Sequence, residues 1–238
     1  MIVNYTEEGW EIITQRAHGL LAAQIASFWN IAERPSRWLE TLTAIACHDD
    51  QNLEFEDREQ LQAAGGPMSF KMNSFDKNYS DHLLNMGMAR SRYIGLLMAR
   101  HLIFLYGDDP KAKVYSKQLK TKERVWLKQA EISTGELDHA YQLLEFCDAF
   151  SLLICRNLVQ PEQRTMEISK GPDNNPYELS QQDAGQLRVS PWPFSVDKFD
   201  LSYELRVVKQ LSFTSDQAFH KALLAAPVKR RTVSCSSK

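Results

Sequence analysis

The carboxylate of Asp148 constrains the fold of this chain more than any other group. It lies in the segment GELDHAYQLLEFCDAFSLLICRNL, whose apolar residues have helical spacing. Positions four and seven residues away share its helix face and are apolar in nature: Tyr141, Leu144, Leu152 and Cys155. A buried carboxylate without a partner is strongly unfavourable unless it becomes protonated. The fold must therefore supply a cation, a network of donors or a metal ion beside Asp148.

Three histidines also fall on apolar helix faces. His18 shares its face with Leu21 and Ile25, His48 follows Ala44 and Ile45, and His101 lies between Leu97 and Leu105. A single buried histidine is usually a hydrogen-bonded core residue. Four inward-facing ligand-type residues on four helices instead predict a metal site in the core. Nitrogen and oxygen ligands favour Zn, Fe, Mn or Ni over Ca. A hydrogen-bonded polar core without metal is the alternative.

The periodicity predicts a mainly α protein, a helical bundle with a small β-sheet formed by N- and C-terminal strands. Residues 1–13 resemble a β-hairpin, and helical patterns follow up to residue 158, with a break near Ser91. We expect a helical domain over 1–158, a polar connection over 159–185, and a small α/β extension over 186–238. Ser215 is the expected N-cap of a short helix in that extension.

Composition excludes several classes of partner. The 238 residues are 43% apolar and 24% charged, and the net charge of -2 provides no electrostatic footprint for nucleic acid or an anionic membrane. No apolar run approaches the ~20 residues of a membrane span. The N-terminus lacks a signal-peptide pattern, and the four cysteines contain no CxxC pair. These features predict a cytoplasmic protein.

Other common catalytic motifs are missing from the sequence. It contains no GxGxxG, GxxxxGK[ST] or GxSxG pattern, and GELDHAY is not HExxH. Cys47 adjoins His48, but neighbours on a helix point about 100° apart. The His and Asp set is therefore the main candidate for chemistry.

The order His18, His48-Asp49, His101, Asp148 resembles the H…HD…H…D pattern of the HD superfamily of metal-dependent phosphohydrolases. The whole chain is more closely similar to DUF3891, a family of unknown function. The segments that carry this resemblance are MIVNYTEEGWEIITQRAHGLLAAQIASFW, AIACHDDQNLEFE, YIGLLMARHLIFLYG and LEFCDAFSLLIC. Gln51 and Asn52 depart from the family pattern, which has a glycine and then an aromatic residue.

The resemblance implies an HD-like fold and one or two divalent transition metal ions (Zn, Fe, Mn or Ni). The implied metal ligands are His18, His48, Asp49 and Asp148. Asp49 would also orient the attacking water, and His101, or His82 from the rim, would stabilise a phosphate or protonate the leaving group.

The expected function is a metal-dependent hydrolase acting on a small phosphorylated molecule. The alternative is a non-catalytic HD-like module that binds a metal or ligand. A homodimer is left open. Phe55, Glu56 and Phe70, in the long polar loop before residue 81, are candidates for a wall of the site.

Overall fold

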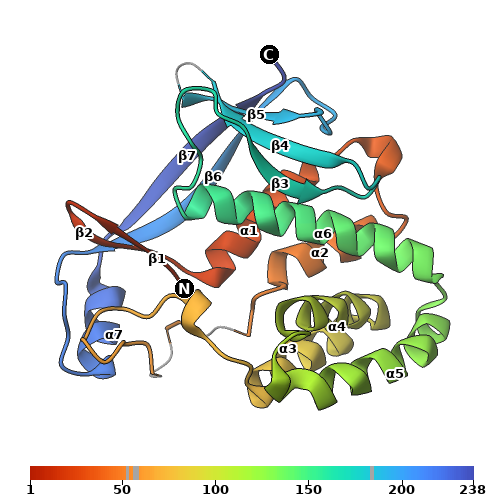
Figure 1. Ribbon diagram of the computed structural model, residues 1–238, viewed down its shortest axis with the longest axis horizontal. Helices are drawn as coiled ribbons and strands as arrows, with labels where there is room; N and C mark the ends of the chain where they lie inside the picture. Colours follow the sequence, from red (N-terminus) through yellow and green to blue (C-terminus); the bar gives the residue numbers. More distant parts are fainter. Residues whose placement is uncertain (52–53, 56–58, 183–184) are drawn as a thin grey trace.

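Within the residues that it describes, the computed structural model contains a seven-stranded mixed sheet and seven α-helices, which Figure 1 shows together. The structure describes residues 1–51, 54–55, 59–182 and 185–238. The helices are α1 (Gln15–Ser27), α2 (Trp38–Cys47), α3 (Lys77–Arg90), α4 (Arg92–Tyr106), α5 (Lys113–Ala130), α6 (Thr134–Cys155) and α7 (Asp216–Ala225). The strands are β1 (Ile2–Thr6), β2 (Gly9–Ile13), β3 (Met166–Lys170), β4 (Pro176–Gln181), β5 (Leu187–Ser190), β6 (Lys198–Val208) and β7 (Val228–Ser236).

The sheet has the order β1-β2-β6-β7-β5-β4-β3, so strands from both ends of the chain lie side by side. All neighbouring strands are antiparallel except β5 and β7, which are parallel. In β6, alternate residues are buried, namely Phe199, Leu201, Tyr203 and Leu205. One face of the sheet is therefore covered, and α1 packs on β6 while α6 packs on β3.

The expectation of a mainly α bundle with a small sheet is wrong, and the description all-alpha is wrong with it. The segment 159–185, expected to be a polar connection, contains β3 and β4. These two strands extend the sheet beyond the strands that the terminal segments supply. Their buried residues, Ile168, Tyr177 and Leu179, alternate with polar residues over very short stretches. The division into three domains stays a prediction.

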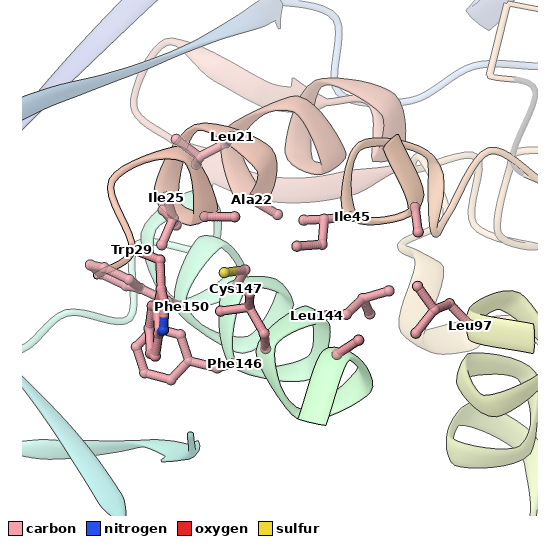
Figure 2. Close-up of a cluster of buried hydrophobic side chains, with 14 of the residues drawn as sticks. Leu21, Ala22, Ile25, Trp29, Ile45, Leu97, Leu144, Phe146, Cys147 and Phe150 are labelled. Carbon is pink, nitrogen blue, oxygen red and sulfur yellow. The ribbon is translucent and has the colours of Figure 1, made fainter. Parts of the chain in front are cut away.

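Helices α1 and α6 pack against each other and lie between the sheet and helices α3, α4 and α5 (Figure 1). Helix α2 packs on α1 and α6, and α4 packs on α6, whereas α7 lies apart from them and packs on β6. Figure 2 shows the apolar core at this junction, where Ala22 and Ile25 of α1 lie near Cys147 and Phe150 of α6. The facing sides of α1 and α6 are therefore buried, and they carry two of the candidate ligands, His18 and Asp148.

Helix boundaries follow local chemistry. Ser91 ends α3 and begins α4, where its hydroxyl accepts from the Ile94 N–H, so the predicted break near Ser91 is confirmed. Ser215 accepts from the Ala218 N–H at the start of α7, which confirms the predicted N-cap. Ser133 and Glu136 form a capping box at the start of α6. This cap fixes the start of the helix that holds Asp148.

Candidate metal centre

Five ligand-type side chains from four helical segments meet in the core. His18 comes from α1, His48 caps the C-terminus of α2, Asp49 follows it, His101 lies on α4 and Asp148 on α6. The three histidines are at most 1% exposed, Asp148 is 6% exposed and Asp49 is 8% exposed. The inward direction predicted for His18, His48, His101 and Asp148 is confirmed.

The tightest part of the cluster is a triangle of two imidazoles and one carboxylate. The Nε2 atoms of His18 and His48 are 3.2 Å apart. Asp148 Oδ1 lies 3.0 Å from His18 Nε2 and 3.3 Å from His48 Nε2. Among the described residues, Asp148 Oδ1 has no partner with hydrogen-bond geometry despite these short distances. Three atoms that carry lone pairs thus face a common point.

The hydrogen bonds of the Nδ1 atoms of His18 and His48 determine which ring nitrogens carry protons. His48 Nδ1 lies 2.7 Å from the Ile45 carbonyl, which can only accept, so Nδ1 donates. The Ser151 hydroxyl donates to the Asp148 carbonyl at 2.9 Å and therefore accepts from His18 Nδ1 at 2.7 Å. In both neutral rings the Nε2 lone pair then faces the other ring. Metal-bound histidines are typically oriented in this way by an acceptor at the second nitrogen.

These separations fit a shared ion. Ligand atoms about 2.0–2.2 Å from one ion lie roughly 2.8–3.6 Å from one another in octahedral or tetrahedral geometry. The three distances of the triangle lie in that range. Asp49 Oδ2 lies slightly beyond it, at 3.8 Å from His18 Nε2 and 3.7 Å from His48 Nε2. His18, His48 and Asp148 are therefore the best-placed ligands, and Asp49 completes the set with a small shift.

Asp49 connects the triangle to His101 and to Gln15. Its Oδ1 lies 3.7 Å from His101 Nε2, and its Oδ2 accepts from Gln15 Nε2 at 2.6 Å. His101 Nε2 is buried and has no hydrogen-bond partner within the described part of the chain. Two overlapping ligand groups result, one of His18, His48 and Asp49 and one of His48, His101 and Asp148. Both groups contain His48, whose Nδ1 atom is engaged by Ile45, so its Nε2 atom can serve only one ion at a time.

Burial and neighbouring charges have opposite effects on the pKa values of His48 and Asp148. Burial disfavours the charged form of His48, but Asp49 and Asp148 outweigh burial and raise the pKa of His48 to about 9. Burial alone would raise the pKa of Asp148, but His48 and His18 hold that pKa well below its ordinary value. Without a metal ion, the carboxylates of the cluster are therefore ionised, and one imidazole carries an additional proton. That proton occupies the position that a divalent cation would take.

A close approach of two helix backbones brings His18 to His48. Gly19 follows His18 on α1, and a Cβ atom at Gly19 would lie 2.5 Å from the Ala46 carbonyl oxygen of α2. Real Cβ atoms do not come so close to a backbone oxygen. Glycine at this position is therefore a condition for the short distance between the two Nε2 atoms.

Other predicted residues lie apart from the cluster. His82 is exposed on α3, and the structure does not bring it to the site. Phe55 is 45% exposed and lies under the Arg206 guanidinium, 5.2 Å from its ring centre, while Phe70 packs on the core. Asn52 and Glu56 lie outside the described residues. Gln51, two positions after Asp49 in the sequence, is buried.

Two supporting residues were missed in the sequence. Ser151 holds His18, and Gln15 holds Asp49. Each lies three positions from a candidate ligand on the same helix, Ser151 after Asp148 and Gln15 before His18. The same i, i+3 rule that selected the ligands would have found both residues.

The fold and the cluster together define an α+β protein with a buried His/Asp centre of the metal-ligand type. The chain belongs to the family of proteins of unknown function DUF3891, whose model matches residues 1–210. The matched range contains all five residues of the cluster. No curated protein and no solved structure matches the chain. No helix in the described ranges has both the length and the apolar character needed to cross a membrane.

Proposed function

We propose that His18, His48, Asp49 and Asp148 bind a divalent transition metal ion, and that the protein is a metal-dependent hydrolase. The observation that carries the proposal is the triangle formed by His18 Nε2, His48 Nε2 and Asp148 Oδ1, with sides of 3.0–3.3 Å. The ligand order along the chain is of HD type, which supports hydrolysis of a phosphoester. HD type refers here to the ligand order and not to an all-α bundle.

Each residue has a distinct role in this proposal. His18 and His48 supply neutral Nε2 ligands because Ser151 and Ile45 engage their Nδ1 atoms. A metal ion in such a site lowers the pKa of bound water toward neutrality. The Asp49 carboxylate, whose Oδ2 accepts from Gln15 Nε2, would orient the attacking water molecule. His101, whose Nε2 has no partner among the described residues, contacts the substrate's anionic oxygen or protonates the leaving group.

The proposal also covers the substrate class and the cellular compartment. A small phosphorylated molecule is the substrate class that the ligand order supports. All four cysteines are free and buried, which supports a reducing compartment such as the cytoplasm.

The burial of the centre favours a second candidate function. The side chains of Asp49 and Asp148 are only 11% and 9% exposed, and those of His18 and His48 are fully buried. Closed sites of this kind often hold structural metals, whereas catalytic sites keep an open position. A non-catalytic metal-binding module is therefore the alternative to the hydrolase.

An activity panel separates the two functions. Purified protein is assayed on phosphomonoesters, phosphodiesters and nucleotides with added Mn, Ni or Zn. The hydrolase proposal predicts metal-dependent turnover that His101→Gln reduces by about 100-fold or more, with metal still bound. His82→Ala, on an exposed face of α3, is the control and should retain full activity. Metal binding without turnover on any substrate would leave the non-catalytic module as the function.

A further inference from the structure

A cavity of about 480 Å³ lies between α3, α4 and the loop that follows Asp49. Its size is that of a small-molecule site. Gln51, Glu54 and Gln60 line it from the loop, Asp76 lines it from the start of α3, and Tyr106 from the end of α4. These residues come from segments far apart in the sequence, and none of them belongs to the metal ligands. The cavity is therefore distinct from the candidate metal centre.

Gln15 links this cavity to the metal centre. Its side-chain Nε2 donates to Asp49 Oδ2 at 2.6 Å, and its backbone N–H donates to Glu54 Oε1 at 2.6 Å. One residue thus touches a candidate ligand on one side and a cavity-lining carboxylate on the other. Burial raises the pKa of Tyr106, and the charge of Asp49 raises it further, so the phenol also lies within the electrostatic reach of the centre. A molecule bound in the cavity would therefore lie close to the candidate metal centre.

The lining is acidic and rich in acceptors. It includes the carboxylates of Glu54, Glu59 and Asp76, and none of its described residues is Lys or Arg. The Met1 amine lies 3.4 Å from Glu54 Oε1 and offsets one of these charges. A phosphate group would meet repulsion here, whereas an organic cation would be attracted.

Two buried amide oxygens provide independent support. Gln51 and Gln60 are 6% and 8% exposed, and the Oε1 atom of each has no hydrogen-bond partner among the described residues. The orientation of Gln60 is set because its Nε2 donates to the Glu54 carbonyl at 2.9 Å, which leaves Oε1 as an acceptor. Buried acceptors without partners are rare in folded proteins and often mark the position of a bound ligand or water molecule. A ligand with N–H donors satisfies them.

We propose that this cavity binds a small organic ammonium ion, so that the substrate of the neighbouring centre carries a cationic amine. The carboxylates neutralise the amine, and the amide oxygens accept its N–H bonds. The rings of Tyr79 and Tyr106, which also line the cavity, provide faces for the cation. The reaction at the amine-bearing substrate rests on the proposed function, but binding of the ammonium ion does not.

Three aromatic probes of similar size and different charge, together with inorganic phosphate, test the proposal. Binding of benzylammonium, benzyl alcohol, benzoate and inorganic phosphate to the full chain is measured by ligand-observed NMR at pH 7.5, in chelator and again with Zn. We expect benzylammonium to bind about tenfold more tightly than benzoate. Benzoate or phosphate binding as tightly as benzylammonium would overturn the proposal.

Matched variants place the probe in the cavity. Glu59→Gln with Asp76→Asn removes two charges, and Asn keeps the acceptor with which Asp76 caps α3. This double variant should weaken benzylammonium binding about fivefold. Glu178→Gln, at an exposed position of β4, should change nothing. Unchanged binding in the double variant would refute the assignment.

Two safeguards keep the test decisive. Glu59→Gln alone, at an exposed position outside any helix or strand, replaces the double variant if that variant fails to fold. If benzylammonium binds but no metal does, only the proposed function is refuted. Metal binding without ammonium binding refutes only the cavity proposal.

Discussion

The Nε2 atoms of His18 and His48 lie 3.2 Å apart in the core, with the Nδ1 atom of each ring engaged by an oxygen on its far side. Two neutral imidazoles arranged in this way present lone pairs to each other, which is unfavourable without a cation between them. A proton or a metal ion removes the repulsion. Metal content and proton release distinguish a proton from a metal ion at this position.

Removal of the Ser151 hydroxyl should weaken metal binding without unfolding the protein. Ser151→Ala deletes the acceptor that orients His18, and loss of such a partner typically costs 10–100-fold in metal affinity. Competition with a chromophoric chelator gives the affinity. Ser116→Ala removes another buried serine, on α5, and should leave the affinity unchanged. Equal affinities in both variants would show that Ser151 does not orient a ligand.

Metal binding near neutral pH should release about one proton. Without metal, Asp49 and Asp148 overcome the effect of burial and raise the pKa of His48 from 6.5 to about 9, so His48 is protonated below that pH. A metal ligand must be neutral, so affinity should rise about tenfold per pH unit between pH 7 and 9 and level off above. Calorimetry in two buffers of different ionisation enthalpy counts the protons. Release of none between pH 7 and 8 would contradict a protonated His48.

A methyl group at Gly19 should damage both the fold and the centre. In Gly19→Ala the new Cβ atom meets the Ala46 carbonyl oxygen at 2.5 Å, so α1 and α2 must move apart. Overpacking of this kind costs about 1–3 kcal/mol, measured by urea unfolding. Metal affinity should fall as well because His18 moves with α1.

Gly135→Ala is the control for this substitution. Its Cβ atom would meet only Ser133 Oγ, at 4.0 Å, so stability and metal affinity should not decrease. If Gly19→Ala behaves like this control, the helix approach at Gly19 is not what sets the distance between His18 and His48.

Glu145 should destabilise the protein at alkaline pH. Burial, with a smaller effect from Asp148, raises the pKa of this α6 carboxyl from 4.5 to about 7. The folded state then binds the proton more tightly than the unfolded state, so stability falls as pH rises from 4.5 to about 7. Glu145→Gln should increase the free energy of unfolding by roughly 1 kcal/mol at pH 8 and have little effect at pH 4.5. A variant that is less stable than the wild type at pH 8 would contradict this account.

The local patterns predicted the helices well and the sheet poorly. The apolar spacing around Ser91 and Ser215 was enough to place a helix break and an N-cap, because capping depends on adjacent residues. Strands β3 and β4 were missed because Ile168, Tyr177 and Leu179 are surrounded by Pro, Asn and charged residues. The pairing of β2 with β6 joins residues nearly 200 positions apart, and no local pattern encodes such a contact.

The candidate centre was predictable for the same local reason. His18, His48, His101 and Asp148 each lie on an apolar helix face, and burial of those faces brings the four together. The distances between them depend on how the helices pack, for example at Gly19, and were not predictable. His82 failed as a rim residue because its own helix face turns it to solvent.

The metal content of the purified protein tests the central claim most directly. Protein isolated without added metal is analysed by elemental mass spectrometry, alongside His48→Ala, Asp148→Ala and the exposed control His82→Ala. We predict about one equivalent of a transition metal in the wild type and the control, and close to none in the two ligand variants. Less than about a tenth of an equivalent in the wild type, with unfolding unchanged by chelator, would show that a proton and not a metal ion occupies the space between His18 and His48.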